Sequence, residues 1–153
     1  ISRGLVGSEM CIRDRLGIVN RPLLAWRDSP GRLSRTHPDY SLDRFIAARA
    51  FAITRLFLAG NEDYTLWGYG PTGRKLAAAL RRRGHRLSGI IEVNPRRIGQ
   101  RIQGVVVDSP EHLHRTRHRP LIVAVSGIEA RTAIRRHLSP RGWTEGEDFI
   151  VTA

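Results

Sequence analysis

From about Tyr64 to the end of the chain, short apolar runs alternate with amphipathic stretches. Each run is bounded by glycine, proline or polar residues, which predicts a series of short strands. The predicted strands are Tyr64–Gly68, Leu87–Val93, Val105–Val107, Leu121–Val125 and Phe149–Val151.

Two of the amphipathic stretches predict helices, one over about Thr72–Arg83 and ended by Gly84, the other over about Ile128–Leu138. Strands that alternate with helices predict a mostly parallel sheet with right-handed crossovers. The predicted fold class is therefore α/β. We expect a Rossmann-like, mostly parallel sheet of about five strands with flanking helices, preceded by a loop and one connecting helix.

The connecting helix is predicted over residues 42–60. Ser41 is a good N-cap, Asp43 suits the positive first turn of a helix, and Gly60 follows the last apolar residue. The predicted apolar face consists of Phe45, Ile46, Ile53, Leu56 and Phe57.

The residues before this helix differ in character. Residues 16–41 are rich in proline, arginine and turn formers and predict a loop, with one short strand near Leu23–Trp26. Residues 1–15 resemble the translated product of a transposase adapter used in shotgun sequencing, so we exclude them from the fold prediction. Met10 is the only methionine in the chain and lies in that stretch. We expect the chain from about Leu16 onward to be the C-terminal fragment of a longer polypeptide.

The turn after the first strand contains three glycines in G-x-G-x-x-G register, Gly68, Gly70 and Gly73. In a dinucleotide-binding turn the first glycine permits a tight bend, the second lets a phosphate approach the backbone, and the third allows close packing of helix on strand. The helix that follows offers N–H groups and a partial positive charge to an anion. Pro71 near the first helical position loses nothing by lacking an N–H.

Further polar residues follow the other strands. Glu92 ends the second strand, 19 residues after Gly73, where an acidic residue can accept a hydrogen bond from a ribose hydroxyl. Ser126 follows the fourth strand, and Arg96 and Arg97 could meet a phosphate or simply form a solvated loop. The candidate ligand contacts are Gly68, Tyr69, Gly70, Pro71, Thr72, Gly73, Arg74, Glu92, Asn94 and Ser126. The alternative is that the glycines only pack the turn of a fold that binds no ligand.

Composition excludes several other kinds of site. The net charge is +12, but Lys75 is the only lysine and the arginines are spread along the chain, so we do not expect nucleic-acid binding. The single cysteine, Cys11, lies in the adapter-like stretch, which leaves no disulfide or thiolate site and favours a cytoplasmic protein. No apolar run is long enough to cross a membrane. His112, His114 and His118 lack a carboxylate or cysteine cluster and do not predict a metal site.

Two stretches, WRDSPGRLSRTHPDYS at Trp26–Ser41 and the segment Leu66–Val107, resemble the C-terminal portion of bacterial family 2 glycosyltransferases that carry an accessory Rossmann-like domain. The resemblance implies that residues 16–41 are the tail of a truncated catalytic domain, residues 42–60 the connecting helix and residues 61–153 the accessory domain. It also implies a nucleotide-sugar donor and a divalent metal held by an Asp-x-Asp motif. This chain has no such motif, so metal and catalytic base would lie in a missing N-terminal catalytic domain.

By the same resemblance, the tail can close over the donor diphosphate with Arg27, Arg32, Arg35 and His37. We find no residue to call catalytic and expect the fragment alone to be inactive. The leading hypothesis is therefore a glycosyltransferase fragment whose accessory domain binds a nucleotide or nucleotide sugar, or positions the catalytic domain. The alternatives are the NAD(P)-binding domain of an oxidoreductase and a ligand-free scaffold or interaction module.

Overall fold

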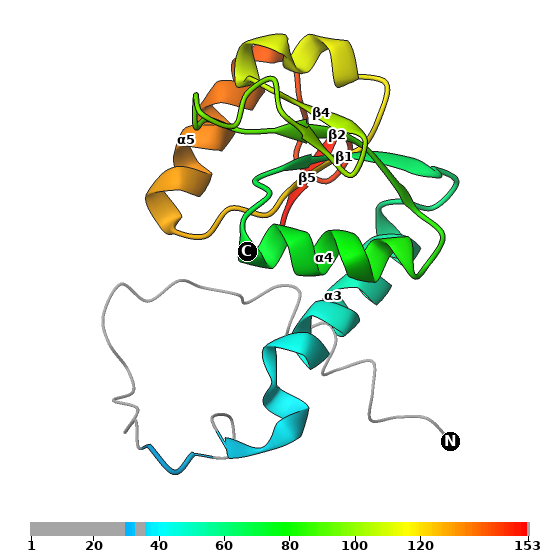
Figure 1. Ribbon diagram of the computed structural model, residues 1–153, viewed down its shortest axis with the longest axis vertical. Helices are drawn as coiled ribbons and strands as arrows, with labels where there is room; N and C mark the ends of the chain where they lie inside the picture. Colours follow the sequence, from blue (N-terminus) through cyan, green and yellow to red (C-terminus); the bar gives the residue numbers. More distant parts are fainter. Residues whose placement is uncertain (1–29, 33–35, 153) are drawn as a thin grey trace, which may run out of the picture.

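The computed structural model describes residues 30–32 and 36–152. Six strands form one sheet in the order β3-β4-β2-β1-β5-β6 (Figure 1). All neighbouring pairs are parallel except β3 with β4. The strands are β1 (Asp63–Trp67), β2 (Arg86–Ile91), β3 (Arg101–Ile102), β4 (Val105–Asp108), β5 (Leu121–Val123) and β6 (Phe149–Val151). The predicted α/β fold is confirmed, with one strand more than predicted.

Helices cover both faces of the sheet. On one face, α4 (Pro71–Arg81) packs on β1 and β2, and α3 (Leu42–Leu56) packs on α4. On the other face lie α5 (Ile128–Leu138) and a 3₁₀ helix, η2 (Pro110–Thr116) (Figure 1). Two short 3₁₀ turns complete the structure, η1 (Pro38–Tyr40) before α3 and η3 (Ser139–Arg141) after α5.

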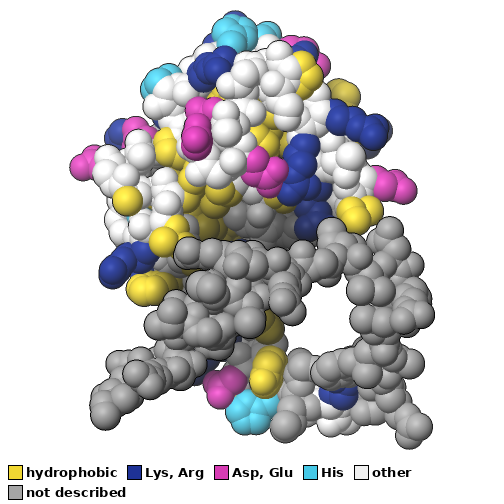
Figure 2. Space-filling model, turned by 180° about the vertical axis from the view of Figure 1, so that it is seen from behind, with side chains coloured by type: hydrophobic (Ala, Val, Ile, Leu, Met, Phe, Trp, Pro, Cys, Tyr) yellow, Lys and Arg dark blue, Asp and Glu magenta, His cyan; other side chains and the backbone are white. Residues whose placement is uncertain are grey.

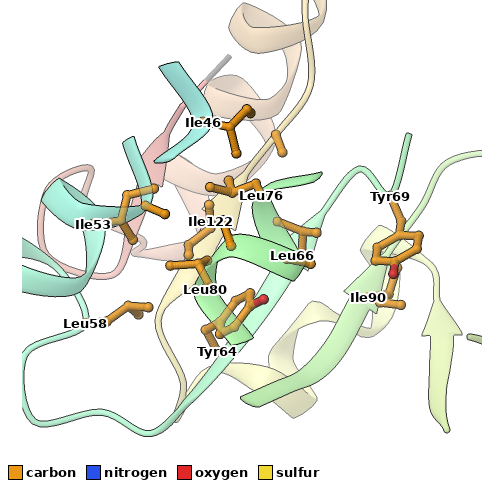
Figure 3. Close-up of a cluster of buried hydrophobic side chains, with 14 of the residues drawn as sticks. Ile46, Ile53, Leu58, Tyr64, Leu66, Tyr69, Leu76, Leu80, Ile90 and Ile122 are labelled. Atoms are coloured by element: carbon orange, nitrogen blue, oxygen red, sulfur yellow. The ribbon is translucent and has the colours of Figure 1, made fainter. Parts of the chain in front are cut away.

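The core has two parts, one on each face of the sheet, and neighbouring residues of a strand contribute to different parts. Leu66 of β1 packs in the cluster beneath α3 and α4, shown in Figure 3, whereas Trp67 packs in the cluster beneath α5. Ile90 and Ile91 of β2 divide in the same way. Because side chains alternate along a strand, a parallel strand covered on both faces must be apolar throughout. This explains the continuous apolar runs in the sequence.

Most predicted boundaries agree with the structure to within a few residues. The α5 and β6 boundaries match, and Pro71 is the first residue of α4, as its missing N–H allows. The second strand ends at Ile91, two residues before the predicted end. Val93 lies beyond the sheet and is 68% exposed. The two-residue strand β3 and the helix η2 were not predicted. The short strand predicted at Leu23–Trp26 lies outside the described residues.

The connecting helix also differs in its ends and its face. Ser41 caps it as predicted, accepting a hydrogen bond from the Arg44 N–H at 3.4 Å, but the helix ends at Leu56 rather than near Gly60. Its buried face is formed by Ile46, Ala50 and Ile53. Phe45 and Leu56, predicted to face the core, are exposed. Apolar residues occur on two sides of α3, and only one side meets α4.

Among the described helices, none combines the length and the apolar character that a membrane span requires.

Candidate functional site

The candidate site lies at β1, where the order of the strands in the sheet reverses. From β1 the chain crosses through α4 to β2 on one side, and β5 lies on the other side of β1 with its helix α5 on the opposite face. In open α/β sheets, ligands bind at the carboxyl ends of two such strands. A pocket of about 510 Å³ opens at this point. It is lined by Trp67, Gly68, Gly70, Pro71, Thr72, Glu92, Val93, Arg97, Ala124, Val125, Ser126, Ala130, Ala133 and Ile134.

The three glycines of the turn differ in their surroundings. Gly68 has a φ of 92°, and a Cβ placed on it would lie 2.6 Å from Val125 Cγ2. A Cβ on Gly73 would lie 2.1 Å from the carbonyl oxygen of Gly68, so helix and strand approach too closely for any side chain. At Gly70, in contrast, an added Cβ would meet no atom of residues 30–32 or 36–152 within 4 Å. The fold therefore requires glycine at positions 68 and 73, whereas Gly70 leaves open space beside the backbone.

That open space lies at the N-terminus of α4. Gly70 is the N-cap residue and provides no side-chain hydrogen bond to the first turn. Its carbonyl oxygen accepts the N–H of Arg74 at 2.9 Å, which closes the first helical turn. The N–H groups at the start of a helix have no acceptor within the helix, and the N-terminus carries a partial positive charge. Thr72, in this first turn, also lines the pocket.

Glu92 is held against the glycine turn. Its side chain is 12% exposed, and its Oε1 accepts hydrogen bonds from the Tyr69 N–H at 2.9 Å and from Arg97 Nη1 at 2.8 Å. Arg97 Nη2 donates to the Tyr69 carbonyl oxygen at 3.2 Å. The Glu92 carboxylate thus binds the backbone N–H of Tyr69, and the Arg97 guanidinium binds its backbone carbonyl. Glu92 lines the pocket, as expected of a ribose acceptor, but one of its oxygens already has two protein donors.

The structure brings six of the ten predicted contact residues into the pocket: Gly68, Gly70, Pro71, Thr72, Glu92 and Ser126. The other four lie elsewhere. Gly73 is buried under the turn, the Tyr69 side chain is buried in the core near Ile90 (Figure 3), and Arg74 is exposed outside the pocket. Asn94 forms a local turn in which its Oδ1 accepts the Arg96 N–H at 3.0 Å.

The apolar wall of the pocket was not predicted. Val125 extends from the end of β5, while Ala130, Ala133 and Ile134 lie on one side of α5. Their spacing of three and four residues is that of one helical face and could have indicated this wall. This wall gives the pocket an apolar surface in addition to the polar backbone of the glycine turn.

The histidines noted in the sequence, His112, His114 and His118, lie in η2 and just after it. Within residues 30–32 and 36–152, no three side chains of His, Cys, Asp or Glu are gathered so as to hold a metal ion. His112 Nδ1 lies 2.6 Å from Asp108 Oδ1 instead. Burial opposes ionisation of Asp108, but its hydrogen bonds with His112 and with the Ser109 N–H hold the pKa of the carboxyl below its ordinary value.

Two of the tail residues predicted to close over a diphosphate, Arg27 and Arg35, lie outside the described residues. His37 accepts the Asp39 N–H at 3.3 Å and caps η1. Basic side chains on the face shown in Figure 2 are dispersed among acidic ones and do not form one continuous patch.

No family model matches the chain, and no curated protein matches it. Among solved structures it is similar to RSP, a Rex-family repressor, at 19% identity and a TM-score of 0.47 over 65% of this chain and 56% of that chain. RSP in complex with β-NADH matches at 19% identity and a TM-score of 0.45, over 60% of this chain and 53% of that chain. RSP in complex with β-NAD+ and operator DNA matches at 21% identity and a TM-score of 0.44, over 59% of this chain and 49% of that chain. The chain therefore spans about half the length of these proteins.

Proposed function

We propose that the domain from Tyr64 onward binds a nicotinamide dinucleotide, NAD(P), at the carboxyl ends of β1 and β5. The pyrophosphate lies against Gly70 at the N-terminus of α4, and the adenosine ribose lies near Glu92. This is the function that the geometry of the pocket supports best.

The observation that carries this proposal is the open space at Gly70. A glycine is expected where a backbone turn or a close contact requires it. Gly70 has an extended backbone with a φ of −77°, which any residue adopts, and no atom of the described residues would meet a Cβ there. The fold does not require glycine at this position, whereas a phosphate that approaches the backbone does.

The rest of the pocket fits a ligand with both charged and aromatic parts. Its volume of about 510 Å³ is within the range of small-molecule sites, about 300–1,000 Å³. The apolar wall formed by Val125, Ala133 and Ile134 provides a surface for a flat aromatic ring. The first turn of α4, which has no side-chain cap, also lines the pocket and suits the diphosphate.

Calorimetric titration of the chain with NAD+, NADH, NADP+, a uridine-diphosphate sugar and coenzyme A tests the proposal. We expect saturable 1:1 binding of a nicotinamide dinucleotide with a dissociation constant below about 1 mM, or about 4 kcal/mol of binding free energy. Binding of the uridine-diphosphate sugar alone would contradict the assignment of the ligand. Failure of all five to bind would favour the ligand-free scaffold.

A second candidate is the accessory domain of a glycosyltransferase, in which the diphosphate belongs to a nucleotide sugar. It is favoured by the attachment of the connecting helix: α3 packs on α4, and Lys75 Nζ lies 2.7 Å from Asp43 Oδ1. A helix fixed in this way would hold a preceding domain at a defined position. The same titration separates the candidates, because here the uridine-diphosphate sugar should bind more tightly than NAD+.

A further inference from the structure

Arg97 forms an ion pair with the residue that would select between NAD and NADP. In a dinucleotide site, an acidic residue after the second strand accepts the 2′-hydroxyl of the adenosine ribose. The same negative charge repels the 2′-phosphate of NADP. In this chain the acidic residue is Glu92, and Arg97 Nη1 lies 2.8 Å from its Oε1.

The ion pair is well placed to suppress that repulsion. The side chains of Glu92 and Arg97 are only 12% and 29% exposed, so solvent screens their interaction less than that of a surface pair. Arg97 is also fixed by a second hydrogen bond, from Nη2 to the Tyr69 carbonyl oxygen at 3.2 Å. A ligand at this end of the pocket therefore meets a paired carboxylate and guanidinium instead of an isolated negative charge.

The hydrogen bonds of Glu92 also reduce its selectivity for a hydroxyl. Its Oε1 accepts from both the Tyr69 N–H and Arg97 Nη1. Selection for NAD by an acidic residue depends on carboxylate oxygens that are free to accept the ribose hydroxyls. Here one of the two oxygens is committed to holding the turn.

We propose that Arg97 is a specificity-determining residue that makes the site tolerant of a 2′-phosphate. The inference rests on the proposed function, because it assumes that a nicotinamide dinucleotide occupies the pocket. The domain then binds NADP+ with an affinity within about tenfold of that for NAD+, or about 1.4 kcal/mol. Glu92 acts chiefly on the conformation of the glycine turn.

The test measures the dissociation constants of NAD+ and NADP+ for the chain and three variants, Arg97→Gln, Arg97→Lys and Arg101→Gln. Arg97→Gln exposes the charge of Glu92, so the ratio of the NADP+ to the NAD+ dissociation constant should rise at least fivefold. Arg97→Lys keeps a positive charge beside Glu92 and should leave the ratio within threefold of its original value. Arg101→Gln makes the same change in net charge on β3, where the Arg101 side chain donates to the Gly104 carbonyl oxygen at 3.2 Å, and should leave the ratio unchanged.

The inference would be overturned if the NADP+ dissociation constant of the unaltered chain exceeded that of NAD+ more than tenfold. It would also be overturned if Arg97→Gln raised the ratio of these two constants less than fivefold. Either result leaves the proposed function intact, because both require that NAD+ binds. Absence of binding by both dinucleotides would instead refute the proposed function and this inference with it. The melting temperature of each variant, measured alongside, shows whether Arg97→Gln remains folded. If it does not, the comparison of Arg97→Lys with the unaltered chain decides, and a rise of more than threefold in the ratio would overturn the role of charge.

Discussion

Two neighbouring strand-to-helix turns form the candidate site, and they are built in different ways. Both lead from a central strand into a helix whose N-cap is a glycine without a side-chain hydrogen bond, Gly70 for α4 and Gly127 for α5. The turn after β1 is tightly packed, since Gly68 and Gly73 leave no room for a Cβ. The turn after β5 is more open: within the part of the chain that the structure describes, a Cβ on Gly127 would meet nothing within 4 Å.

The difference separates two tasks of a binding site. In the β1–α4 turn, steric contacts and the hydrogen bonds of Glu92 fix the backbone before any ligand arrives, which lowers the entropy lost on binding. The β5–α5 turn contributes Val125 and Ser126 to the pocket, and a Cβ on its Gly127 would meet no described atom within 4 Å. We infer that the first turn positions the ligand and the second adapts to it.

The largest effect is expected for Gly73→Ala. The new Cβ would lie 2.1 Å from the Gly68 carbonyl oxygen, which belongs to the backbone and cannot rotate away. We expect a loss of more than about 4 kcal/mol in the free energy of unfolding, measured by urea denaturation. Gly60→Ala is the control. Gly60 has a φ of 79°, so alanine there would be strained, but its Cβ would have open space among the described residues. Equal losses in the two variants would show that the turn is not tightly packed.

Gly68→Ala and Gly127→Ala compare the two turns directly. Their φ angles are 92° and 93°, so both variants should lose about 1–3 kcal/mol through backbone strain. Gly68→Ala should lose about 2 kcal/mol more, because its Cβ meets Val125 Cγ2. In a Val125→Ala background this excess should largely disappear. If it persists, the strain at Gly68 has another origin than this contact.

Glu92→Gln tests the hydrogen bonds that hold the first turn. The amide oxygen of glutamine can still accept both hydrogen bonds, but the substitution removes the negative charge that pairs with Arg97, so we expect a loss of about 1 kcal/mol in unfolding free energy. Glu129→Gln makes the same charge change in the first turn of α5 and should change stability by only a few tenths of a kcal/mol. Similar losses would contradict the difference between the turns.

The smallest effect is expected at the opposite ends of the strands. There Arg86 donates two hydrogen bonds to Asp63, which lowers the pKa of this carboxyl. Because the pKa is lower in the folded state, the stabilisation is fully present above the unfolded value of about 3.9 and is lost as the pH falls through the folded value. Asp63→Asn should therefore weaken the acid dependence of the melting temperature below about pH 4 and leave dinucleotide binding unchanged. A change in binding would show that the turns are not independent of this pair.

The sequence predicted those parts of the molecule that have a local signal. The glycine register located the first turn, and the structure confirms the packing roles predicted for Gly68 and Gly73. The apolar runs located five of the six strands, whereas β3 has only two residues, too few for a period. Periodicity also failed to choose between the two apolar sides of α3, because the choice depends on contact with α4.

The remaining part of the site depends on contacts between segments that are separate in the sequence. The position of Glu92 indicated an acidic residue near a ribose, but not that Tyr69 and Arg97 would already occupy one of its oxygens. Arg97 was predicted as a possible phosphate contact, and its pairing with a residue five positions earlier has no sequence signature. Such side-chain contacts follow from the path of the loop after β2, which the pattern of apolar residues does not determine.

The most direct test of the proposed function is the affinity of the variant Gly70→Ser for NAD+. Serine adds a Cβ in open space and can accept hydrogen bonds from the first-turn N–H groups of α4, so the free energy of unfolding should stay the same or rise by a few tenths of a kcal/mol. The same atoms would occupy the space of the pyrophosphate, and we expect the dissociation constant for NAD+ to rise at least tenfold, about 1.4 kcal/mol. An unchanged dissociation constant in a variant of unchanged stability would contradict a pyrophosphate site at Gly70.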